Sequence, residues 1–148
     1  MKRVDALLGD YASSHRTRGN LACHAVGISL ILFGVFSFLG QVPLVRGWTA
    51  SEALIGLAFV AYATLDVPLA LGVLGFAAVL DLAARAVGDW RVGACAFVVG
   101  WIFQAIGHSV YEKNKPAFFR NLIHLLVGPA YLVAETLKLR RSATRSRG

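Results

Sequence analysis

The sequence predicts an all-α integral membrane protein with four transmembrane helices and a broken C-terminal helix. Of its 148 residues, 57% are hydrophobic and only 16% are charged, whereas soluble domains usually carry about 25% charged residues. Residues 21–40 contain no formally charged side chain, and their length is roughly that of a helix crossing the hydrocarbon core. Helices are expected because backbone groups in lipid must be hydrogen-bonded within the segment.

Five apolar segments follow one another along the chain. They cover residues 21–40, 51–65, 67–84, 92–107 and 122–137. Pro68 removes a backbone donor and disfavours helix in the residue before it, so the middle stretch should break there. The alternative is one long tilted helix over residues 52–85, which would give three passes. Residues 85–91, which include Gly88 and Asp89, are expected to form a loop.

The last apolar segment is interrupted by Gly128 and Pro129. We therefore expect a re-entrant or interfacial helix there, and a fifth full span is the alternative. The whole chain, residues 1–148, is expected to be one membrane domain. Within it, residues 1–20 form a cytoplasmic N-terminal segment, residues 21–137 a helical bundle and residues 138–148 a basic tail.

The basic residues predict the orientation of this bundle. Twelve of the fifteen Lys and Arg residues lie before the first segment, after the fourth or in the tail. The positive-inside rule then places the N-terminus and the loop at 111–121 in the cytoplasm. Topology and anionic lipid account for the net charge of +7, so we expect no nucleic-acid partner. A bacterial inner membrane is favoured, or the endoplasmic reticulum if the protein is eukaryotic.

All four histidines lie at or near the edges of apolar segments. With four passes, the start of the first segment and the end of the fourth reach the same face of the membrane. Asn20 and His24, and likewise His108 and Glu112, are four residues apart and share a helix face. Imidazoles with a carboxylate suit iron(II), although zinc accepts similar ligands. The alternative is that each imidazole is hydrated at the membrane interface and binds no metal. The histidines concerned are His15, His24, His108 and His124.

Ionisable groups within apolar segments are costly and often functional, but two acids here have simpler explanations. Asp66 is positioned to cap the break before Pro68. Asp81 precedes Arg85 by one helix turn, which allows an ion pair. Glu112 has a similar alternative, since Lys113 and other basic residues follow it directly.

Several motifs resemble the family of membrane-bound, iron(II)-dependent 2-hydroxy-fatty-acid dioxygenases. They are Tyr11-x-x-x-His15, Asn20-x-x-x-His24, the string from Trp101 to Ala117, Asn121-Leu-Ile-His124 and Gly128-Pro129. The similarity covers roughly residues 8–137. One departure is that Ile28 and Ser29 stand where many relatives have proline.

The resemblance implies an α-oxidation that converts a 2-hydroxy fatty acid, bound within the lipid bilayer, to an acid one carbon shorter. Fe(II) would be the cofactor and molecular oxygen the co-substrate. His15, His24 and His108 match the family's metal-binding positions, and His124 matches one where related sequences can have glutamine. We interpret Glu112 and Asn20 as catalytic. Four cations are expected to attract the substrate carboxylate: Arg16, Arg18, Lys113 and Lys115.

Two other functions remain open from the sequence. A small membrane scaffold or transporter would use the polar residues at segment edges only for packing and anchoring. A zinc-dependent lipid hydrolase would act without oxygen. The sequence predicts neither the oligomeric state nor the preferred chain length of a substrate.

Overall fold

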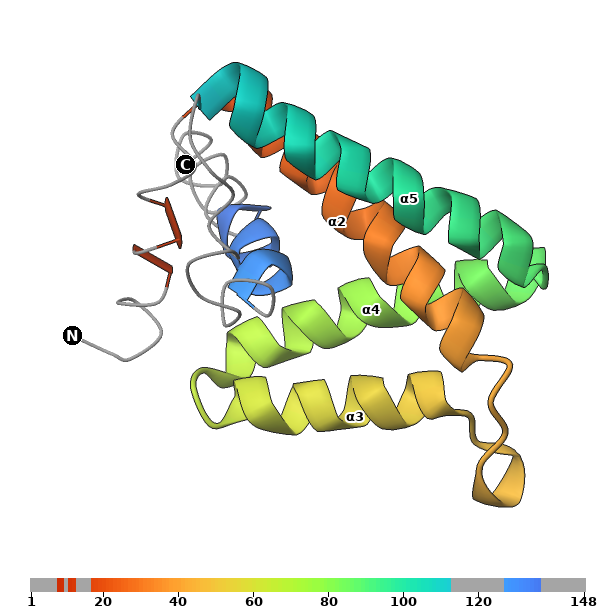
Figure 1. Ribbon diagram of the computed structural model, residues 1–148. Helices are drawn as coiled ribbons and strands as arrows, with labels where there is room; N and C mark the ends of the chain where they lie inside the picture. The colour runs from red at the N-terminus through yellow and green to blue at the C-terminus, as the bar shows by residue number, and fades with distance from the viewer. Residues whose placement is uncertain (1–7, 10, 13–16, 113–126, 137–148) are drawn as a thin grey trace, which may run out of the picture.

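The computed structural model describes residues 8–9, 11–12, 17–112 and 127–136, and all the regular elements within these ranges are helices (Figure 1). This confirms the all-α prediction. The elements are α2 (Arg18–Leu39), the 3₁₀ turn η1 (Val45–Gly47), α3 (Ala50–Ala63), α4 (Val67–Val87), α5 (Trp90–Ile106), the π-helical turn η2 (Gly107–Glu112) and a helix over residues 127–136.

The prediction of four spans is confirmed only in part. Among the described residues, three helices are long and apolar enough to cross a membrane: Arg18–Leu39, Val67–Val87 and Trp90–Tyr111. The helix α3 has 14 residues, which gives a length of about 21 Å against a hydrocarbon core of about 30 Å. The expected re-entrant helix is not established, because the start and the end of its segment lie outside the described residues.

The break in the middle of the apolar stretch is confirmed, and the alternative of one long helix is wrong. The helix α3 ends at Ala63, and α4 begins at Val67 with Pro68 in its first turn. The Asp66 carboxylate caps α4 by accepting a hydrogen bond from the backbone N–H of Leu69 at 2.9 Å. The chain therefore reverses, and α3 and α4 form a helical hairpin (Figure 1).

The helices α2 and α5 pack closely and antiparallel through opposed glycines. A Cβ atom added at Gly27 would lie 2.8 Å from the carbonyl oxygen of Gly100, and one added at Gly34 would lie 2.6 Å from that of Gly93. Both distances are too short for a real side chain, so only glycine allows the two backbones to approach this far. This packing brings the start of α2 beside the end of α5 (Figure 1).

The α3–α4 hairpin meets the α2–α5 pair at one end and diverges from it toward the other, as Figure 1 shows. At the crossing, Phe36 of α2 packs with Ala77 and Ala84 of α4. In the wider part, the helix over residues 127–136 contributes Ala130, which packs with the α4 residues Leu69 and Val73. The two helix pairs therefore enclose a wedge-shaped space, which is filled by packed side chains at the narrow end, where α2 crosses α4.

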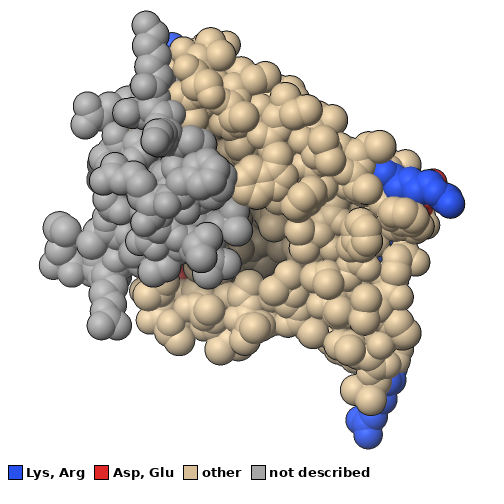
Figure 2. All heavy atoms as spheres, viewed as in Figure 1, with Lys and Arg blue, Asp and Glu red and all other residues tan. Residues whose placement is uncertain are grey.

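The outer surface is apolar over most of its extent. The α3 and α4 residues Leu57, Val79 and Leu82 are each more than 60% exposed. On the face in Figure 2, the lysines and arginines lie mainly at the extremities, and the surface between them is almost entirely tan, with only small charged spots. Such a surface suits contact with lipid, because a monomer in water rarely exposes large apolar patches.

The loop expected at residues 85–91 is reduced to two residues. The helix α4 continues through Arg85 to Val87, and Gly88 ends it in the left-handed conformation with φ 66°. Asp89 then caps α5 by accepting a hydrogen bond from the backbone N–H of Arg91 at 2.8 Å. A glycine at the C-terminus followed by an aspartate cap allows two helices to join this tightly.

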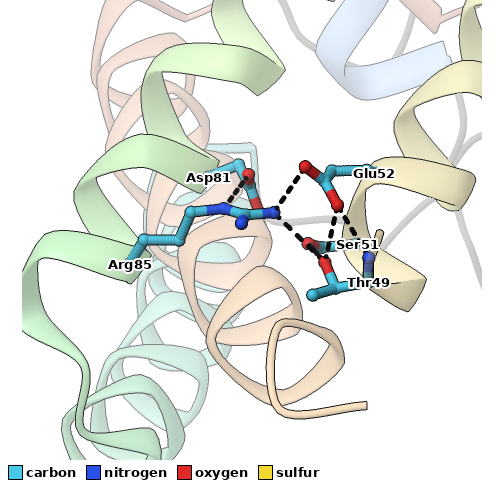
Figure 3. Close-up of polar contacts among 5 residues, drawn as sticks. All are labelled: Thr49, Ser51, Glu52, Asp81 and Arg85. Atoms are coloured by element: carbon cyan, nitrogen blue, oxygen red, sulfur yellow. Dashed lines mark hydrogen bonds and ion pairs between the residues drawn. The ribbon is translucent and has the colours of Figure 1, made fainter. Parts of the chain in front are cut away.

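A polar cluster ties the start of α3 to the end of α4 (Figure 3). Arg85 Nε donates to Asp81 Oδ2 at 2.7 Å, which confirms the predicted ion pair within α4. Arg85 Nη2 also lies 3.1 Å from Glu52 Oε1 and donates to Thr49 Oγ1 at 3.1 Å. Thr49 and Glu52 form the capping box of α3. The Arg85 guanidinium therefore links the first turn of α3 to the last turns of α4.

We predict that Arg85→Ala lowers the free energy of unfolding by about 1–3 kcal/mol, between the values for surface and buried ion pairs. The cause is that Asp81, only 5% exposed, would lose its partner. Chemical unfolding in detergent micelles measures the change. The control is Arg91→Ala, because the Arg91 guanidinium lies over the Trp90 ring at 5.4 Å and forms no ion pair with the residues that the structure describes. Equal losses in both variants would contradict the role assigned to the cluster.

We predict that Gly100→Ala destabilises the protein by about 1–3 kcal/mol through overpacking, because the new Cβ would lie 2.7 Å from the Gly27 carbonyl oxygen. The matched control is Gly75→Ala in α4, where a Cβ would meet nothing within 4 Å. That change should be neutral or stabilising by up to about 1 kcal/mol, since alanine favours helix more than glycine does. The midpoint of thermal unfolding distinguishes them, and a stable Gly100→Ala protein would refute the close α2–α5 packing.

Candidate metal and substrate site

Two of the four histidines lie in contact where α2 begins and α5 ends. His24 is in the second turn of α2 and His108 is in η2, and they are 5% and 2% exposed. Their Nε2 atoms are 3.0 Å apart, and the ring planes are nearly perpendicular, at 84°. The structure thus brings together residues 84 positions apart in the chain, as the sequence predicted for an even number of passes.

The segment that carries His108 is not a regular α-helix. Residues Gly107–Glu112 form a π-helical turn, in which the hydrogen bonds span one residue more than in an α-helix. The spacing of His108 and Glu112 was predicted for an α-helix, and the structure has a π-helical turn there instead. The side chain of Glu112 is outside the described part, so its place beside His108 stays a prediction. Single π-helical turns inside α-helices are frequent at functional sites.

Tyr11 forms a hydrogen bond with Nδ1 of His24, the ring nitrogen that does not face His108. Its hydroxyl lies 3.3 Å from His24 Nδ1, and its ring packs on Tyr131 with 5.0 Å between the centroids. Burial, and to a lesser degree Tyr131, raise the pKa of the Tyr11 phenol well above its usual value, so the hydroxyl stays protonated. A hydrogen bond at Nδ1 fixes the ring of His24 with Nε2 directed at His108.

The histidine pair fits two neighbouring ligand positions of one metal ion. Nitrogen ligands about 2.1 Å from a metal and at the 90° angle of octahedral coordination would lie about 3.0 Å apart, which is the separation observed here. The same distance also fits a hydrogen bond between a protonated and an unprotonated Nε2. The described ranges contain no group of three or more potential metal ligands, and His15 and His124 lie outside them.

Asn20 is fully buried one helix turn before His24. Neither Oδ1 nor Nδ2 of its amide has a hydrogen-bond partner within the described part of the chain, and such a buried group costs about 1–3 kcal/mol when unpaired. The side chain packs against Gly107, where a Cβ would collide with it. Asn20 is not part of the cavity wall described next, so its expected catalytic role stays a prediction.

A cavity of about 300 Å³ extends from the histidine pair into the wedge between the helix pairs, and Figure 2 shows the surface hollowed there. This volume is at the lower end of the range for small-molecule pockets. One face of α2 lines it continuously over three turns, through His24, Ile28, Ile31, Leu32, Val35 and Phe36. The opposite walls come from α3, α4, α5 and the helix over residues 127–136.

The lining is polar at one end and apolar at the other. Tyr11, His24, Gln104 and His108 lie at the histidine end, whereas Phe36, Ile55 and Ala77 lie where α2 crosses the hairpin. An elongated cavity of this kind suits an amphipathic molecule with one polar end and a long apolar chain.

Sequence reasoning missed two polar residues of this site. Gln104 is 6% exposed and lines the cavity one helix turn before His108. Its polar amide, four residues before a histidine in an otherwise apolar segment, is the sequence feature that could have identified it. Tyr11 was noted only within a motif, and nothing in the sequence predicted its contact with His24. Of the cations expected to attract a carboxylate, Arg18 is exposed at the start of α2. The others, Arg16, Lys113 and Lys115, lie outside the described residues.

The fold and the site define a helical membrane protein with a buried histidine pair at the polar end of an apolar cavity. The chain belongs to the 2-hydroxy-palmitic acid dioxygenase Mpo1-like family, which matches residues 1–140. It is 33% identical over 134 residues to the 2-hydroxy-palmitic acid dioxygenase MPO1 of Saccharomyces cerevisiae, covering 85% of this chain and 74% of the yeast protein. No solved structure matches the chain. The family resemblance drawn from the sequence is confirmed.

Proposed function

We propose that this protein is an iron(II)- and oxygen-dependent dioxygenase that converts 2-hydroxy fatty acids to acids one carbon shorter. The observation that carries the proposal is the contact between His24 and His108 at the polar end of the apolar cavity. Membership of the family and the name of the yeast relative support the reaction class and the substrate. The paired imidazole nitrogens support a metal.

The proposed reaction balances with molecular oxygen as the only co-substrate. A 2-hydroxy acid and O2 give the shortened carboxylic acid, carbon dioxide and water. The bond between C1 and C2 breaks, and C2 is oxidised from an alcohol to a carboxylic acid while O2 is reduced. Iron(II), when bound, supplies a redox centre for oxygen and a Lewis acid for the oxygen atoms of the substrate.

The residues proposed to hold iron(II) are His24 and His108, together with His15 and His124 from the family resemblance. Binding through Nε2 requires that the proton of His24 be on Nδ1, from which it is donated to the Tyr11 hydroxyl oxygen. Tyr11 thus acts as a positioning residue that selects the tautomer with a free lone pair on Nε2. We retain Glu112 and Asn20 as proposed catalytic residues.

The cavity is proposed to bind the substrate with its polar end at the histidines. The apolar walls exclude water from the alkyl chain, and Gln104 places an amide beside the histidine pair, where it can donate a hydrogen bond to a carboxylate. Arg16, Arg18, Lys113 and Lys115 remain the proposed cations for drawing the carboxylate to the membrane surface.

We further propose that the protein is an integral membrane enzyme, in a bacterial inner membrane or, if eukaryotic, in the endoplasmic reticulum. Three helices of sufficient length and apolarity support insertion. The excess of basic residues flanking the start of α2 and the end of α5 supports a site at the cytoplasmic face.

We predict that His24→Ala and His108→Ala each lower the shortening of 2-hydroxypalmitate by more than about a hundredfold, because each removes a proposed metal ligand. Product formation by purified protein in detergent, in air and under nitrogen, measures this. The control is Cys95→Ala, which changes an exposed position of α5 away from the cavity and should leave the rate unchanged. Full activity in either histidine variant, or equal product without oxygen, would contradict the proposal.

A further inference from the structure

The apolar end of the cavity is closed by a packed layer of side chains where α2 crosses the α3–α4 hairpin. Phe36 is only 3% exposed and packs with Ala77 and with the half-buried Ile55. All three residues line the cavity. Ala84 belongs to the same packed cluster but not to the cavity wall. The wall that α2 contributes to the cavity therefore ends at Phe36, and the packed cluster continues beyond it to Ala84.

The distance from the histidine pair to Phe36 determines how long an alkyl chain the cavity can hold. His24 and Phe36 are twelve residues apart on one continuous helix, which corresponds to about 18 Å along its axis. With C–C bonds of about 1.5 Å, an extended alkyl chain advances about 1.25 Å per carbon. About fourteen chain carbons therefore fit between the polar end and the Phe36 ring.

We infer that Phe36 is the residue that limits the length of the alkyl chain accepted by this cavity. This inference depends on the proposed function only for the identity of the polar headgroup. The location of the closed end does not depend on it. Phe36 suits this role because its ring forms the boundary between the cavity and the core cluster. A smaller side chain there extends the cavity along the same face of α2, and a larger one at Ala77 shortens it.

The turnover test compares saturated 2-hydroxy acids from 2-hydroxylaurate to 2-hydroxybehenate. Removing the ring in Phe36→Ala should extend the accepted chain by about three carbons. Each additional buried methylene favours binding about fourfold. 2-Hydroxystearate is two methylenes longer than 2-hydroxypalmitate and lies within the extended limit, so its kcat/KM relative to that of 2-hydroxypalmitate should rise at least about tenfold. Ala77→Leu should shift the preference toward shorter chains. Phe36→Leu provides a milder variant with a smaller shift in the same direction, should Phe36→Ala not fold.

The matched control is Phe38→Ala, which removes the same ring two positions along α2. Phe38 is 51% exposed, lies against Trp90 at 5.5 Å between centroids and does not line the cavity. Its replacement should leave the chain-length profile unchanged. An equal shift in Phe38→Ala, or a wild-type profile in both Phe36 variants, would overturn the inference.

A binding measurement on iron-free protein separates this inference from the proposed function. Fatty acids without the 2-hydroxyl, from laurate to behenate, are titrated while tryptophan fluorescence is followed, because Trp101 lines the cavity. The affinity of wild-type protein should stop rising near palmitate and that of Phe36→Ala should continue to rise. If this occurs without any oxygen-dependent shortening, the role of Phe36 stands and the proposed function fails. The same length limit in both proteins would overturn the role of Phe36 even if turnover occurs.

Discussion

The close approach of α2 and α5 is the constraint on which the site depends. Helices in lipid gain little from hydrophobic association, so their packing relies on contact between small residues. Gly27 against Gly100 and Gly34 against Gly93 provide that contact and fix the register in which the two helices run past each other. This register places His24 and His108 at the same level. A slip by one helix turn would separate the two imidazoles by about 5 Å.

The α3–α4 hairpin turns this helix pair into a binding site. It returns the chain so that α5 runs antiparallel to α2, and it leans away from the pair to leave the cavity between them (Figure 1). The Arg85 cluster closes the hairpin where α3 begins and α4 ends, while the histidine pair lies where α2 begins and α5 ends. The ion pairs of Arg85 and the proposed metal site at His24 and His108 therefore lie at different ends of the bundle.

Several local features were predictable from the sequence, although the loop expected at residues 85–91 is mostly helix, and most of the packing between distant segments was not. The break at Pro68, the cap by Asp66 and the Asp81–Arg85 pair depend on residues within one helix turn, and all three are confirmed. The contact of Tyr11 with His24 and the closure at Phe36 each depend on how segments distant in the sequence meet. The glycines that set the α2–α5 register are seven residues apart in each helix, at 27 and 34 and at 93 and 100, but the sequence alone does not show that these two faces oppose each other. For His24 and His108, the sequence predicted only that an even number of passes would place them at the same face of the membrane, and their direct contact is a finding of the structure.

The central claim is that His24 and His108 hold iron(II), and metal binding by the purified protein tests it most directly. Protein loaded with iron(II) without oxygen and then desalted should retain about one iron per chain, as expected for a single site. His24→Ala and His108→Ala should retain almost none. Tyr11→Phe should still bind iron, with an affinity lowered by about 10–100-fold. Wild-type protein without stoichiometric iron, or full retention in both histidine variants, would contradict the account.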